Sequence, residues 1–70
     1  MKRHMFSVKP GRSGWVLTEN GEPVDRFKTR HGAVAFGDIK AYAIFRFAGI
    51  PSALTVFVDD TVSVTAAKYG

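Results

Sequence analysis

The chain has 70 residues, a net charge of +4, 46% hydrophobic and 13% aromatic residues, and no cysteine. These values predict one domain over residues 1–70 whose core needs no disulfide, and they exclude thiolate metal sites and thiol nucleophiles. The lack of cysteine fits a reducing, cytoplasmic compartment, and we expect no membrane span because Lys40 and Arg46 interrupt the most apolar stretch.

Three strand-like runs come first. Residues 5–8 alternate in polarity and are followed by a cluster of turn residues, and residues 15–19 form the second run. Asn20-Gly21 is a strong hairpin signal, after which residues 24–28 return as a third strand. Pro23 lies near the start of that strand and cannot donate to a ladder, so we expect the strand to be short or at an edge.

The loop length of this hairpin decides which side chains share a face. A two-residue loop at Asn20-Gly21 would place Phe27 on the face opposite Trp15 and Leu17. A three-residue loop with a left-handed residue shifts the pairing by one and puts all three on one face. We predict the three-residue loop, because it buries three large apolar side chains together and leaves the charges in water.

Residues 30–48 are predicted to form a helix. Thr29 is a fair N-cap, and Gly49 followed by Ile50-Pro51 is a stop signal. Residues 54–58 and 62–66 then form a second hairpin across an acidic turn, in which Asp59-Asp60 is typical of a turn.

The element order is therefore β-β-β-α-β-β. It predicts an α+β fold, with one antiparallel sheet of four to five strands and one helix packed on one face. The residues expected between helix and sheet are Trp15, Leu17, Phe27, Leu54, Val56, Val62 and Val64.

The predicted helix carries two apolar stripes about a third of a turn apart. The first, suited to close packing on a sheet, holds Ala33, Gly37, Ala41, Ile44 and Ala48. The second holds Phe36, Ile39, Ala43 and Phe47. One sheet cannot cover both stripes, so the second predicts a partner, most simply a second copy in a two-fold dimer. The alternative is a rotated helix, whose large residues form the core while the small ones are exposed.

The predicted partner interface consists of this second stripe and a flanking cation: Phe36, Ile39, Lys40, Ala43 and Phe47.

The excess positive charge lies entirely in residues 1–31. Candidate contacts for an anion or a nucleic acid are Arg3, Lys9, Arg12, Arg26, Lys28 and Arg30. Arg26, Lys28 and Arg30 recur at every second position, so on a strand they would line one face and could follow a phosphate backbone. Phe57 is the one clear outward aromatic residue. Ordinary solubility charge is the alternative interpretation.

The sequence contains no arrangement typical of catalysis or metal binding. His4 and His31 have no carboxylate spaced to orient either ring as a base, and they lack the spacing of metal ligands. We therefore predict a non-enzymatic binding module with no cofactor and no metal. It would self-associate or bind another protein through its helix, and the alternative is a sequence-independent nucleic-acid-binding accessory protein that uses the basic half.

The chain resembles a family of small single-domain bacterial proteins of unknown function. The similarity rests on Gly14-Trp15-Val16, Asn20-Gly21, Phe27-x-Thr29-x-x-x-Ala33, small residues at Gly37 and Ala41, Asp59-Asp60, and the tail Tyr69-Gly70. The resemblance implies a fold and no catalytic residues. The chain departs from the family pattern at His31-Gly32 and at Phe36, Ile39 and Phe47, where a charged helix surface is usual.

Residues 14–48 are also similar to the N-terminal arm-binding domain of tyrosine recombinases. The shared pattern is a Gly-Trp strand, a hairpin, Phe-x-Thr and an alanine-bearing helix. That domain lays a three-stranded sheet in the DNA major groove, so this resemblance implies nucleic-acid binding.

Overall fold

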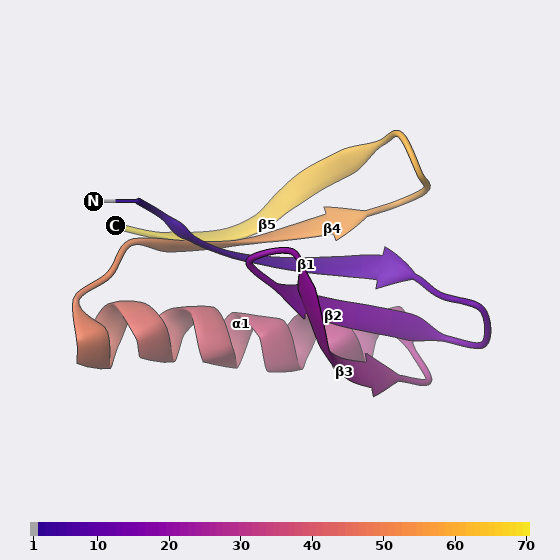
Figure 1. Ribbon diagram of the computed structural model, residues 1–70, viewed down its shortest axis with the longest axis horizontal. Helices are drawn as coiled ribbons and strands as arrows, with labels where there is room; N and C mark the ends of the chain where they lie inside the picture. The colour runs from indigo at the N-terminus through magenta and orange to yellow at the C-terminus, as the bar shows by residue number, and fades with distance from the viewer. Residues whose placement is uncertain (1) are drawn as a thin grey trace.

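The computed structural model describes residues 2–70 as one sheet with one helix against it (Figure 1). The elements are β1 (His4–Pro10), β2 (Trp15–Glu19), β3 (Glu22–Phe27), α1 (Arg30–Ala48), β4 (Ser52–Phe57) and β5 (Ser63–Tyr69). The predicted α+β class and the order β-β-β-α-β-β are confirmed. No helix in this part of the chain is long and apolar enough to cross a membrane.

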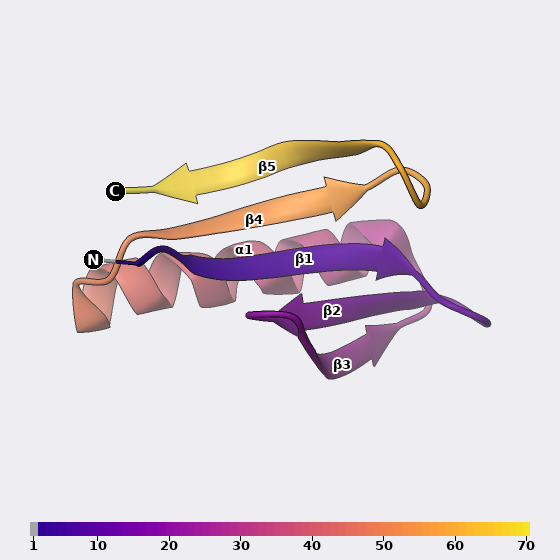
Figure 2. The same cartoon turned by 45° about the horizontal axis from the view of Figure 1, so that its top comes forward.

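The sheet is mixed, with strand order β3-β2-β1-β4-β5 (Figure 2). β1 and β4 are parallel, and the other neighbouring strands are antiparallel, so the predicted antiparallel sheet is wrong at its centre. The physical reason is the connection: α1 carries the chain back along the sheet from the end of β3, so β4 starts in the same direction as β3 and β1. This crossover places Phe6 opposite Leu54 and Val8 opposite Val56.

Trp15 lies opposite Phe27, so the predicted common face is confirmed, but the predicted loop is wrong. Asn20 and Gly21 have φ values of 51° and 90°, which a two-residue turn between twisted antiparallel strands requires. The change of parity comes instead from a β-bulge at Val24, which has no partner in the register of β2 with β3. The bulge follows a proline, at a position where the ladder is already interrupted.

The helix packs through its small stripe, so the rotated alternative is wrong. Ala33, Gly37 and Ala41 are its buried residues. A Cβ atom added at Gly37 would lie 2.8 Å from Leu54 Cδ1 and 3.1 Å from Leu17 Cδ1. The helix therefore approaches the sheet so closely that the leucine side chains occupy the space a larger residue would need.

Both ends of α1 have the predicted caps. The Thr29 hydroxyl accepts a hydrogen bond from the Gly32 amide at 3.0 Å. Gly49 is left-handed at φ 69° and its N–H donates to the Phe45 carbonyl at 3.1 Å. These caps explain why the helix begins and ends where the sequence predicts.

The core lies between α1 and the four strands β2, β1, β4 and the C-terminal half of β5. It is formed by Phe6, Val8, Leu17, Ala33, Ala41, Leu54 and Val56, with Trp15 and Phe27 partly buried against it. Val62 and Val64 were expected in this core but are 50% and 54% exposed, so that expectation is wrong. Val64 lies opposite Val56 and thus on the helix side of the sheet, but the β4–β5 hairpin bends away from α1 at this end (Figure 1).

Side-chain hydrogen bonds fix the other end of β5. The Tyr69 hydroxyl donates to the Asp38 carboxylate on α1. The Arg3 guanidinium donates to the carbonyls of Ser52, Tyr69 and Gly70 at 3.1, 3.2 and 3.0 Å. The hydrogen bond to Asp38, with a smaller contribution from burial, raises the pKa of Tyr69 above its ordinary value of 10.0.

Substitution Gly37→Ala tests the close approach of α1 to the sheet. Overpacking costs about 1 to 3 kcal/mol and the gain in helix propensity returns about 1 kcal/mol, so we expect a net loss of stability in urea unfolding. Gly32→Ala is the matched control, because its Cβ would at closest meet the Thr29 hydroxyl at 3.2 Å, and it should be neutral or stabilising. Equal effects of the two substitutions would contradict the packing argument.

Titration of Tyr69 tests its hydrogen bond to Asp38. The chain has two tyrosines, so Tyr42→Phe leaves Tyr69 alone in an ultraviolet absorbance titration. The midpoint should lie above 10.0, and Asp38→Ala should lower it. Because the folded pKa exceeds the unfolded one, the associated stability is present at neutral pH and is lost as pH rises through the folded pKa. An identical midpoint with and without Asp38 would rule out this contact.

Candidate interaction surfaces

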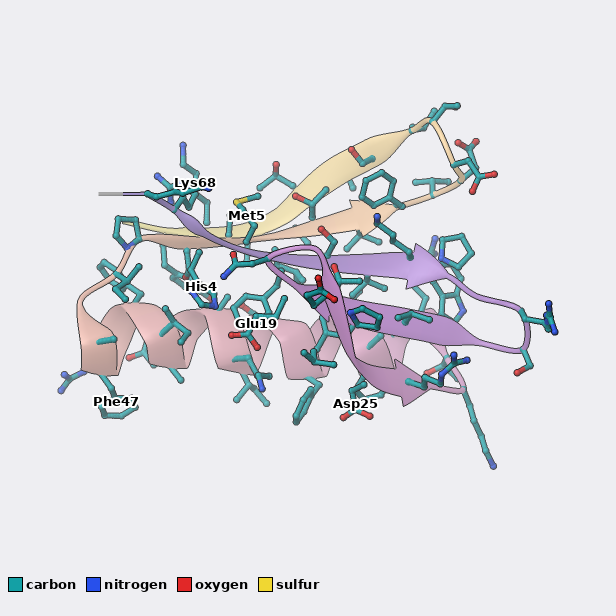
Figure 3. The ribbon with its side chains drawn as sticks, viewed as in Figure 1. His4, Met5, Glu19, Asp25, Phe47 and Lys68 are labelled. Carbon is teal, nitrogen blue, oxygen red and sulfur yellow. The ribbon has the colours of Figure 1, made fainter. Side chains whose placement is uncertain are left out.

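The face of α1 turned away from the sheet is apolar. Ile39 is 66% exposed and Phe47 is 81% exposed. Phe36 is more enclosed, because its ring lies 5.5 Å from that of Phe27 and the Lys40 ammonium is 5.6 Å from its centre. Phe47 points away from the sheet (Figure 3). The structure thus brings the predicted interface residues onto one surface and leaves the largest of them in water.

A shallow hollow of about 510 Å³ lies beside Phe47. It is lined by Glu19, Lys40, Ala43, Ile44, Phe47 and Ala48. It exists because the β2–β3 hairpin turns back at Glu19–Glu22 while α1 continues beyond it (Figure 1). The C-terminal half of α1 therefore has no strand against this flank, and its small alanines form the floor of the hollow.

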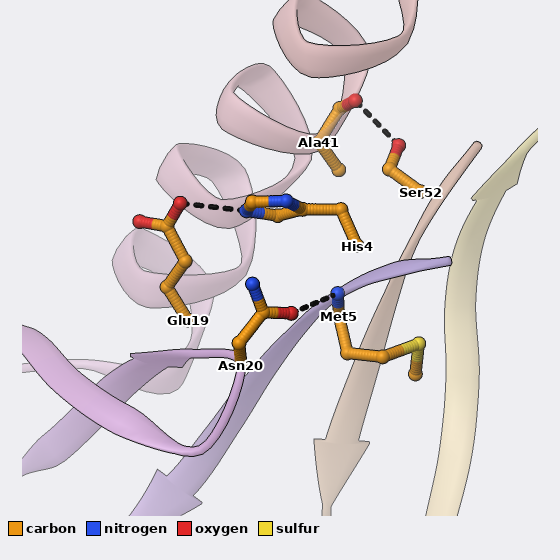
Figure 4. Close-up of polar contacts among 6 residues, drawn as sticks. All are labelled: His4, Met5, Glu19, Asn20, Ala41 and Ser52. Carbon is orange, nitrogen blue, oxygen red and sulfur yellow. Dashed lines mark hydrogen bonds and ion pairs between the residues drawn. The ribbon is translucent and has the colours of Figure 1, made fainter. Parts of the chain in front are cut away.

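Polar contacts hold the strand ends next to this hollow (Figure 4). His4 Nε2 lies 2.6 Å from Glu19 Oε2, which holds the Glu19 carboxylate at the rim. The prediction that no carboxylate orients the His4 ring is therefore wrong, because β1 and β2 bring together two residues that are far apart in the sequence. The Asn20 side-chain oxygen accepts from the Met5 amide at 2.9 Å, and the buried Ser52 hydroxyl donates to the Ala41 carbonyl at 2.5 Å. The lining of the hollow thus includes one charge of each sign, Glu19 and Lys40.

The basic candidates separate into two groups. Lys9 and Arg26 lie on the sheet face without the helix, each opposite Val16. Arg12 is in the turn after β1 and Lys28 follows β3, so all four gather around one end of the sheet.

Arg3 and Arg30 do not belong to that group. Arg3 binds the C-terminal carbonyls. Arg30 opens α1, and its guanidinium lies 5.7 Å from the ring centre of Trp15, on the helix side. The predicted line of Arg26, Lys28 and Arg30 on one face is wrong, because β3 ends at Phe27 and strand alternation does not continue past it.

A second hollow of about 170 Å³ lies at this basic end. It is lined by Gly11, Ser13, Gly14, Trp15, Val16, Arg26, Phe27 and Lys28, none of which is acidic. A Cβ atom at Gly14 would lie 2.5 Å from the Phe27 carbonyl oxygen, so glycine is required for the turn to approach β3. The outward aromatic Phe57 is half-buried, and the Lys9 ammonium lies 5.0 Å from its ring centre.

Within residues 2–70, no three His, Asp or Glu side chains are placed to hold a metal ion. The Asp59 carboxylate accepts hydrogen bonds from the amides of Thr61 and Val62 at 2.8 and 2.9 Å. These hydrogen bonds lower the pKa of Asp59 below its ordinary value, and the bond from the Thr61 amide contributes most. Asp59 therefore organises the β4–β5 turn, as its position in the sequence indicates.

Sequence reasoning missed two features of these surfaces. Glu19 forms a wall of the hollow beside α1, and the valines at the β4–β5 turn are uncovered. Both depend on the length of the helix relative to the strands in space, for which the sequence carries no local signal.

Comparisons with models of protein families, with curated proteins and with solved structures find no match for this chain. The argument about function therefore depends on the surfaces themselves, and the two family resemblances stay predictions.

Proposed function

We propose that this chain is a non-enzymatic interaction module whose helix α1 packs against α1 of a second copy. The observation that carries the proposal is the pairing of Phe47, which protrudes, with the adjacent hollow floored by Ala43 and Ala48. A two-fold contact needs a self-complementary surface, and here the protrusion and the recess lie side by side. Each copy's Phe47 would enter the hollow of the other.

The energetics favour a contact of moderate strength. Burial of a large apolar side chain contributes about 1.5 to 3 kcal/mol, and Phe47 and Ile39 would be buried in both copies. Association costs roughly 4 to 15 kcal/mol in lost freedom, so these side chains bring the balance close to favourable, and the enclosed Phe36 ring adds area. Glu19 and Lys40 at the rim have opposite charges, and the Arg46 guanidinium lies 5.5 Å from the centre of the Phe47 ring. Each copy therefore brings one net positive charge close to the contact.

Substitution Phe47→Glu should at least halve the mass of the assembly measured by analytical ultracentrifugation. The chain should stay folded by circular dichroism, because this side chain is almost entirely in water. Val24→Glu is the matched control, a half-exposed apolar residue on β3 outside the hollow, and it should leave the mass unchanged. An unchanged mass for Phe47→Glu would reject the helix contact.

We propose sequence-independent nucleic-acid binding as a second candidate, because a specific grouping favours it. Arg26 and Lys28 line a hollow without acidic lining residues, and Lys9 and Arg12 come from the same end of the sheet. Lys9 also lines a neighbouring hollow that contains Asp59 and Asp60. Cations at one end of a flat sheet can contact successive phosphates without reading bases. Arg3 and Arg30 are excluded from this proposal, since both are engaged elsewhere.

Charge reversal tests the second candidate. The double variant Arg26→Glu/Lys28→Glu should remove retention on random duplex and single-stranded DNA, and each lost phosphate contact should reduce the salt slope by about one. Lys2→Glu/Lys68→Glu gives the same change in net charge away from the basic hollow and away from Phe47, and it should retain binding. If the unmodified chain does not bind at low salt, this candidate is wrong.

A further inference from the structure

We propose that β5 is a second self-association surface, which pairs edge to edge with β5 of another copy and extends the sheet across a two-fold axis. This contact lies on a different part of the molecule from the helix face and goes beyond the proposed function.

The two edge strands of the sheet, β3 and β5, differ in a way that points to β5. β3 carries Pro23, the bulge at Val24 and the charged residues Asp25 and Arg26, features that prevent strand addition. β5 has seven residues, SVTAAKY, with no proline and one charge, Lys68. Its outward N–H and C=O groups have no strand partner among residues 2–70, so its edge is open to another strand.

The side chains next to this edge also lack a cover. Val64 lies opposite Val56, and the Val58 amide donates to the Val62 carbonyl at 2.8 Å, so Val58, Val62 and Val64 share the helix side of the hairpin. Each is about half exposed. A two-fold axis perpendicular to the sheet keeps the helix side of one copy on the helix side of the other. The valines of both copies would then form one continuous apolar strip.

We place the two-fold axis between the Ser63 residues of the two β5 strands, so that each Ser63 lies directly opposite the other. This register places Val62 of one copy opposite Val64 of the other. Ser63 is the first residue of β5, and residues 59–61 form the turn before it, so regular pairing in this register is short and centred on residues 62–64 of each copy. The exposed valines of one copy then face those of the other across the axis, so a second copy of this chain is the occupant that covers them by symmetry.

A single cysteine at the axis tests this geometry, because the natural chain contains none. Directly opposite residues of an antiparallel pair have Cβ atoms about 4.5 to 5.5 Å apart, and a small backbone shift brings them to the roughly 3.5 to 4.5 Å of a disulfide. Mild oxidation of dilute Ser63→Cys should give a covalent dimer at least tenfold faster than Ser13→Cys, an exposed serine in the β1–β2 turn. Equal rates would overturn the proposal. This is also the result expected if β5 pairs with a strand of a different protein, because the substituted positions of two copies would then not meet.

Mass measurements separate this contact from the helix contact. Two different two-fold contacts on one chain build a tetramer or a longer assembly, so Phe47→Glu alone and Val64→Lys alone should each give dimers, and the double variant a folded monomer. Val24→Lys, on the protected edge, is the matched control and should leave each mass unchanged. If Phe47→Glu alone gives monomers, the β5 contact is wrong and the helix contact stands. If Val64→Lys alone gives monomers, the helix contact is wrong and the β5 contact stands.

Discussion

The fold depends on how closely α1 approaches the sheet at Gly37. The tips of Leu54 and Leu17 lie 2.8 and 3.1 Å from where a Cβ atom of residue 37 would be, so at its point of closest approach the helix can present only small residues to the strands. Its bulky side chains must then lie on the flanks and the outer surface. The exposed Ile39 and Phe47 are therefore a consequence of the same packing that buries Ala33 and Ala41. The core and the candidate interface are two results of one constraint.

The second constraint is that one helix must cover a sheet of five strands. α1 lies over the central strands and the C-terminal end of β5, where Asp38 accepts from Tyr69. It leaves the β4–β5 turn bare at one end and extends past the short β2–β3 hairpin at the other. The two uncovered apolar surfaces, around Val64 and around Phe47, arise from this mismatch of length. A larger domain would cover them with further elements, whereas a chain of 70 residues can cover them with a copy of itself.

Local features of this fold could be predicted from sequence, and features that depend on strand order could not. The caps at Thr29 and Gly49 and the small helix stripe follow from residue type and spacing over one or two turns. The parallel pairing of β1 with β4 and the binding of Arg3 to carbonyls near the C-terminus join residues about 50 or more positions apart. The alternation of polarity correctly placed Val64 on the helix side of the sheet. It could not show that α1 does not extend over that position.

The candidate surfaces are spatially compatible with one another. The basic end of the sheet, around Lys9 and Arg26, lies on the face without the helix, so a contact between two α1 helices leaves it open. A β5 pair joins the sheets at the edge opposite to β3, so it also leaves the basic ends accessible, and it keeps the helix-free faces of both copies on the same side. Self-association would then multiply a weak phosphate contact, since two basic ends on one rigid body bind a long polyanion more tightly than either end alone. The proposed self-association would therefore strengthen the proposed nucleic-acid binding.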